Sequence, residues 1–62
     1  MNELQTVINE VRRQRQAISE ALASGRAGDF ADYKRMCGVY DGLGRAEIYA
    51  TELMHNIETS DD

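Results

Sequence analysis

Three glycines, Gly38, Gly42 and Gly44, stand inside a stretch that otherwise has helical spacing, and this conflict constrains the fold most strongly. Three glycines within a helix cost roughly 3 kcal/mol relative to alanine. A chain of 62 residues rarely gains more than ~3–5 kcal/mol from its own core. Either the second helix is broken near Gly42 to Gly44, or it is continuous or kinked and the glycines let a neighbour approach closely. We favour the second interpretation.

Composition limits what else can stabilise so short a chain. One cysteine excludes an internal disulfide, and one histidine without clustered carboxylates predicts neither a metal site nor a cofactor. A net charge of −4 argues against a general nucleic-acid binder, so nucleic acid is not an expected partner. No apolar run approaches the ~18 residues needed to cross a membrane. Oligomerisation, or docking on a larger protein, is therefore the remaining way to stabilise the fold.

The segment 2–24 is predicted to be a helix. Asn2 can cap it, and Glu3 suits the positive end of the helix dipole. Alternating steps of four and three residues, typical of a coiled-coil seam, separate six of its positions. These positions are Leu4, Ile8, Val11, Arg15, Ile18 and Leu22, and Val7 and Ala21 widen the stripe on one side.

Arg15 is the charged exception on this seam, and two interpretations stay open. Its alkyl stem can lie along the stripe with the guanidinium in water, or the arginine can be buried or interfacial, where it sets the register or binds the carboxylate of a partner. Arg12 and Arg13 are expected to lie on other faces of the helix. There they would be solvated and would not form a nucleic-acid-binding patch.

The segment 25–29 is predicted to be a tight turn. Gly25 suits a left-handed helix cap, and Asp29, with Asp32 three residues later, suits the start of the next helix. A short connection makes the helices antiparallel neighbours. The prediction is therefore one all-α domain over 1–62, an antiparallel helical hairpin with a frayed acidic end at 59–62.

The second helix, predicted over 30–58, carries two apolar stripes, so its two halves are expected to bury different faces. One stripe is Val39, Leu43, Ala46, Ala50, Leu53 and Ile57, and the other is Phe30, Tyr33, Cys37 and Tyr40. The end of this helix is expected to run past the first helix and to need another chain as its partner. The predicted protein interface consists of Tyr33, Cys37, Gly38, Tyr40, Gly42, Leu43, Leu53, Met54 and Ile57.

No catalytic site is predicted. His55 and Cys37 lie eighteen residues apart on different faces, and a two-helix chain offers little concavity for converging acid, base or nucleophile groups. The protein is therefore not expected to be an enzyme.

The stretch from Gly28 to Ala46 resembles short uncharacterised proteins encoded among the head-assembly and packaging genes of tailed bacteriophages. The residues that carry the resemblance are Gly28, Asp29, Asp32 and Tyr33 with the basic Lys34 after them, and then Gly38 and Gly42 at a spacing of four, Leu43 and the small Ala46. The resemblance implies a virion component or assembly partner at the portal or head-to-tail region. It also implies a location in the cytoplasm of the bacterial host during assembly, or in the virion.

These observations lead to the expectation of a non-catalytic phage structural or assembly protein that acts through helix contacts. Its expected partners are further copies of itself, a larger phage structural protein, or both. The alternative is a small dimeric regulatory module, either similar to Rop-like RNA-binding hairpins or an inhibitor of a host protein.

Overall fold

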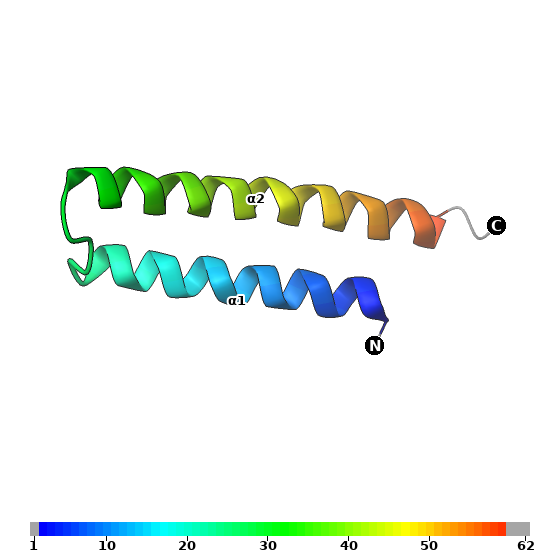
Figure 1. Cartoon of the computed structure of the whole chain (residues 1–62). Coiled ribbons are helices and arrows are strands. Elements are labelled where there is room, and N and C mark those ends of the chain that lie inside the picture. The colour runs from blue at the N-terminus through cyan, green and yellow to red at the C-terminus, as the bar shows by residue number, and fades with distance from the viewer. Residues whose placement is uncertain (1, 60–62) are drawn as a thin grey trace.

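The protein is an antiparallel hairpin of two helices (Figure 1). The computed structural model describes residues 2–59, in which α1 spans Glu3–Ala23 and α2 spans Phe30–Thr59. The predicted helices, 2–24 and 30–58, agree with these bounds to within one residue. Thr59 is still helical, so the predicted fraying is wrong at that position, and residues 60–62 lie outside the described residues.

The two ends of α1 have the caps that the sequence predicts. The Asn2 Oδ1 atom accepts a hydrogen bond of 2.7 Å from the Gln5 N–H. At the other end, Gly25 has a φ of 72°. The N–H of Gly25 donates to the Leu22 carbonyl at 3.2 Å, and the N–H of Arg26 donates to the Ala21 carbonyl at 3.0 Å. These two bonds form a Schellman motif, which ends the helix.

Two aspartates fix the start of α2. The Asp29 Oδ1 atom accepts a hydrogen bond from the Asp32 N–H at 2.8 Å, and the Asp32 Oδ2 atom accepts one from the Gly28 N–H at 3.0 Å. Each of the two carboxylates thus accepts a hydrogen bond from a backbone N–H at this helix start, an arrangement similar to a capping box. The predicted cap at Asp29 is thereby confirmed.

The second helix runs through its glycines without interruption, which confirms the continuous helix favoured from the sequence, and the alternative of a break near Gly42 to Gly44 is wrong. The close-approach interpretation also fails at Gly38 and Gly42, because a Cβ atom at either position would meet no atom within 4 Å. Only Gly44 has a close neighbour across the hairpin, the side chain of Arg15 at 3.4 Å. In the hairpin, the open space at Gly38 and Gly42 leaves their helix-propensity cost without compensation.

One face of α2 contacts α1 along its length, and it lies between the two predicted stripes. The expectation that the two halves of α2 bury different faces is therefore wrong. We call the contacting positions the inner seams, and on both helices their steps alternate between four and three residues. The inner seam of α1 is Leu4, Ile8, Val11, Arg15, Ile18 and Leu22, and that of α2 is Met36, Tyr40, Leu43, Glu47, Ala50 and Met54.

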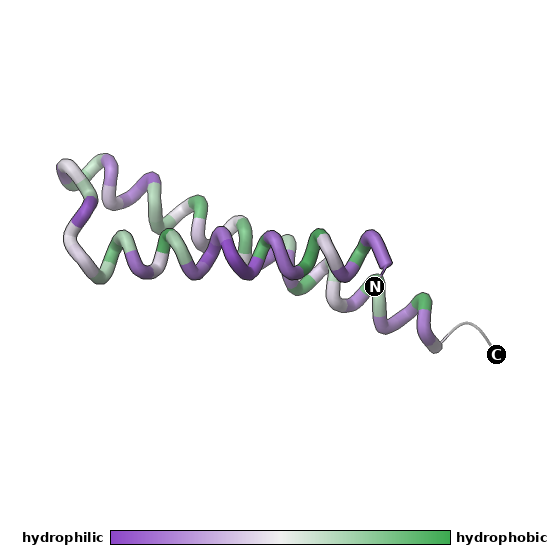
Figure 2. Tube along the Cα trace, turned by 90° about the horizontal axis from the view of Figure 1, so that it is seen from below, coloured by the Kyte–Doolittle hydropathy of each residue, from purple (hydrophilic) through white to green (hydrophobic). Residues whose placement is uncertain are grey.

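The hairpin is long and thin, with extents of 51 × 18 × 14 Å. Its Cα radius of gyration is 14.7 Å, against about 11 Å for a compact domain of this length. Figures 1 and 2 both show that the carboxyl end of α2 extends beyond the start of α1. Ile8, 1% exposed, is the one fully buried side chain among residues 2–59. The hairpin therefore has a line of contact rather than a closed core.

Replacing Ile8 by alanine should unfold the isolated hairpin. Removal of a buried isoleucine costs about 2–5 kcal/mol, which is comparable to the ~3–5 kcal/mol available to so small a core. Far-UV circular dichroism at 25 °C should show a loss of most helicity. Ile48→Ala is the control, because Ile48 is 58% exposed and its truncation should change stability by less than about 0.5 kcal/mol. Equal losses for both variants would contradict this assignment of the core.

Replacing Gly38 by alanine should stabilise the protein by about 1 kcal/mol, because alanine has the higher helix propensity and its Cβ would meet open space. Urea unfolding monitored at 222 nm would measure the change. A destabilised Gly38→Ala variant would mean that a neighbouring chain packs closely on this glycine.

Candidate functional site

Two arginines of α1 bind one carboxylate of α2 midway along the hairpin. The Arg15 Nη1 atom lies 2.7 Å from Glu47 Oε1, and the Arg12 Nε atom lies 2.9 Å from Glu47 Oε2. The Arg15 and Glu47 side chains are 30% and 19% exposed. Of the two interpretations of Arg15, the one in which it binds a carboxylate is confirmed, and the carboxylate belongs to the same chain. Arg12 lies on another face of α1 and is 54% exposed, as expected, but its guanidinium still reaches the same carboxylate.

The Arg15 guanidinium is held on three sides. Its carbon lies 4.6 Å from the centre of the Tyr40 ring, which favours a cation over its face. Nε and Nη2 lie 3.4 Å from the position that a Cβ would take at Gly44, and Nε is buried without a hydrogen-bond partner. A side chain larger than alanine at Gly44 would therefore displace the guanidinium. Gly44 is the glycine with an evident structural role inside α2.

The arginines alter the titration of their partners. A hydrogen bond from Arg12 and a weaker effect of the hydrogen bond from Arg15 lower the pKa of the Glu47 carboxyl below its ordinary value. The hydrogen bond to Glu47 raises the pKa of Arg15. Elsewhere on α1, a hydrogen bond from Arg13 lowers the pKa of Glu10 to about 2. Arg12, Arg13 and Arg15 are thus all engaged by carboxylates.

Sequence reasoning missed Glu47, although the sequence carries a signal for it. The inner seam of α2 contains one acidic residue, as the inner seam of α1 contains one basic residue. The two stripes predicted on α2, of which the one through Val39 and Leu53 is wholly apolar, lie to either side of its inner seam. The match between two oppositely charged seam positions could have identified the contacting face.

A second set of side chains lies on one side of the hairpin; all are apolar except Gln14, and all are exposed except the half-buried Ala21. We call this set the apolar face. Each member directly precedes an inner-seam residue, so the set follows the inner seams along one edge. Val7 is 52% exposed, Val39 is 41% exposed and Leu53 is 52% exposed. The apolar face consists of Val7, Gln14 and Ala21 of α1 and of Val39, Ala46 and Leu53 of α2.

The predicted interface residues fall into three groups rather than on one surface. Four of them are half-buried, namely Cys37, Tyr40, Leu43 and Met54. Three apolar side chains are about half exposed, namely Tyr33, Leu53 and Ile57. Gly38 and Gly42 face open space.

Met54 was expected beyond the reach of α1, and this expectation is wrong. Met54 lines a groove with Leu4, so α1 contributes to its burial. Leu53, one position earlier, is the residue that stays exposed.

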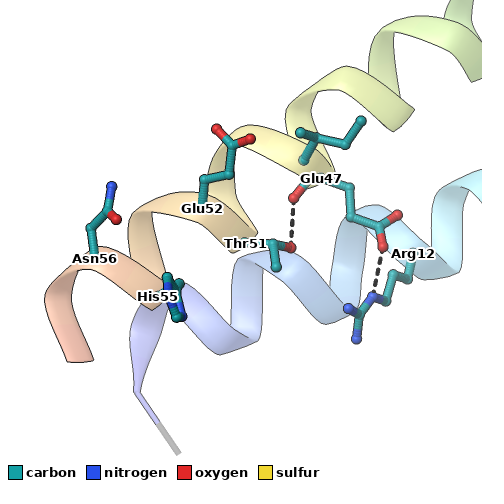
Figure 3. Close-up of a pocket in the computed structure, with 7 residues that line it drawn as sticks. Arg12, Glu47, Thr51, Glu52, His55 and Asn56 are labelled. Atoms are coloured by element: carbon teal, nitrogen blue, oxygen red, sulfur yellow. Dashed lines mark hydrogen bonds and ion pairs between the residues drawn. The ribbon is translucent and has the colours of Figure 1, made fainter. Parts of the chain in front are cut away.

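The opposite side of the hairpin carries an open groove of about 610 Å³ (Figure 3). The Arg12 side chain borders it from α1, and the Thr51 hydroxyl donates to the backbone carbonyl of Glu47 at 2.7 Å. In Figure 3 the Glu52 and Asn56 side chains point away from α1. The groove is lined by Arg12, Glu47, Ile48, Thr51, Glu52, His55 and Asn56.

Within the described part of the chain, no group of three or more His, Cys, Asp or Glu residues is arranged to hold a metal ion. No helix formed by residues 2–59 combines the length and hydrophobicity that a membrane span requires. Comparison of the chain with protein-family models, curated proteins and solved structures gives no match.

Lowering the pH from 5 to about 3 should destabilise the hairpin through Glu47. A carboxylate whose pKa is lowered by folding contributes stability above its unfolded pKa of ~4.3, and this contribution is lost as the pH falls through the folded pKa. In Glu47→Gln, the thermal midpoint at pH 7 should be lower, and the drop between pH 5 and 3 should be smaller than in the original protein.

The matched control is Asp41→Asn. Asp41 also pairs with an arginine, Arg45 at 3.1 Å, but both side chains are at least 66% exposed, so its loss should be nearly neutral. A pH profile that is the same in Glu47→Gln as in the original protein would contradict a stabilising role for the Glu47 carboxylate.

Proposed function

We propose that this protein is a non-catalytic structural or assembly protein of a tailed bacteriophage and that it acts through helix contacts with protein partners. The exposed apolar face carries the proposal, since Val7, Val39 and Leu53 each leave about half of their side chain in water. The hairpin exposes 4769 Å², whereas a compact monomer of this mass would expose about 4,000 Å². Apolar side chains gathered in the open on one side of a protein are typical of a surface that binds another protein.

The arginine-rich segment of α1 supports a protein partner over RNA. In Figure 2 the middle of α1 is the most hydrophilic part of that helix. Its arginines are nevertheless occupied by Glu47 and Glu10, so binding to phosphates would first have to break these pairs. A basic face that is neutralised in this way favours assembly over a Rop-like function.

The phage setting rests on the resemblance of the stretch from Gly28 to Ala46. Under this proposal the protein is present in the cytoplasm of the infected bacterium during assembly, and the portal or head-to-tail region of the particle is its expected place. The absence of catalysis is part of the same proposal, supported by a groove whose central carboxylate, Glu47, already binds two arginines.

Particle purification from infected cells would test the proposal. A tagged copy of the chain should sediment with heads or complete particles through a density gradient. Leu53→Glu should abolish this association, because it places a charge on the apolar face, whereas Ile48→Glu should retain it. Leu53 and Ile48 are similarly exposed, at 52% and 58%, but lie on opposite sides of the hairpin.

Two results would contradict the proposal. One is a chain found only in fractions free of particles at every stage of infection. The other is salt-sensitive binding to RNA that is lost on replacing Arg12, Arg13 and Arg15 by alanine, which would establish the Rop-like alternative.

A further inference from the structure

We propose that the apolar face binds a second copy of this chain and that two hairpins form a twofold symmetric four-helix bundle. This inference rests on the proposed function, of which it specifies one partner.

Each helix carries a second seam beside its inner seam. These outer seams also step alternately by three and four residues, as helices in bundles do. Their shared members, such as Val11 and Leu43, are half-buried, while members unique to the outer seams, such as Val7 and Val39, are exposed. The outer seams are Leu4, Val7, Val11, Gln14, Ile18 and Ala21 of α1, and Val39, Leu43, Ala46, Ala50 and Leu53 of α2.

Both outer seams lie on the same side of the hairpin. The groove marks the opposite side, and it is lined by residues that directly follow inner-seam positions, Arg12 from α1 and Ile48 and His55 from α2. Residues that directly precede inner-seam positions must lie on the other edge of each helix. Val7 of α1 and Leu53 of α2 therefore belong to one continuous surface, as in half of a bundle that has been cut between its hairpins.

The area favours a second copy as the occupant. Each separate hairpin exposes 4769 Å², and a compact protein of twice the chain mass would expose about 6,700 Å². Forming the bundle would therefore bury about 2,800 Å² in total, within the range of obligate homodimers. A standard interface needs about 1,600 Å², so even an imperfectly closed bundle clears that size.

Charge permits this self-association although each chain carries a net charge of −4. The outer seams contain no charged residue, and their single polar member is Gln14, whose amide donates to Glu10 at 3.0 Å. A twofold axis brings the same patch of both chains together. An uncharged patch can pair with itself without placing like charges in contact.

Sedimentation equilibrium at micromolar concentration should give twice the chain mass of 7.0 kDa. Because unfolding would be coupled to dissociation, the thermal midpoint should also rise with protein concentration. Val39→Glu and Leu53→Glu should each raise the dissociation constant of the dimer at least about 100-fold, since each would place an unpaired charge in the apolar interface. Ile48→Glu, on the opposite side, should leave both mass and midpoint unchanged, and Val7→Glu tests the contribution of α1.

A folded monomer with a midpoint independent of concentration would overturn the inference, and so would a dimer that dissociates in Ile48→Glu but not in Leu53→Glu. A dimer weakened by Leu53→Glu but not by Val7→Glu would overturn the four-helix arrangement. If the chain is a monomer yet sediments with phage particles, the second copy is wrong and the proposed function stands. If the chain is a dimer that never associates with particles, the proposed function is wrong and the second copy stands as the partner.

Discussion

The ion pair between Arg15 and Glu47 determines how the two helices meet. Both residues occupy inner-seam positions, where most neighbours are apolar, and Arg12 adds a second donor to the same carboxylate. An arginine on such a seam requires a carboxylate opposite it and space for the guanidinium, and Glu47 and Gly44 provide these. A rotation of α2 about its axis would separate the charges and leave them partly buried without partners, which is costly. The pair therefore selects one face of α2.

The caps and the helices were predictable because their causes are local. Asn2, Gly25 and Asp29 act on backbone groups within five residues of themselves, so their identity in the sequence is sufficient evidence. The contacting face of α2 was not predictable in this way. It depends on which residue of α1 lies opposite Glu47, and a seam containing a charge looks less like a core than the wholly apolar seam beside it.

The three glycines of α2 show the same limit of prediction from sequence. The sequence indicates that glycines within a helix need a reason, but it does not distinguish one glycine from another. Of the three glycines inside α2, only Gly44 has a neighbour that a side chain would touch, and this neighbour is a long charged side chain rather than a helix backbone. Close helix approach at Gly38 and Gly42 was inferred from their spacing of four residues, and spacing alone carries no information about what lies opposite.

The arrangement of charge and apolar surface links this fold to the proposed assembly. Within the hairpin, a charged pair on the inner seam specifies which faces meet, and charged pairs contribute more to specificity than to net affinity. The apolar residues that would ordinarily form a core, such as Val39 and Leu53, are left on the outer seam. An outer seam of this kind gains its stabilisation only when another helix covers it, because burial of apolar area is what contributes free energy. Folding of the hairpin and binding of its partner then become parts of one process, in which the ion pair sets the geometry and the partner covers the outer seams.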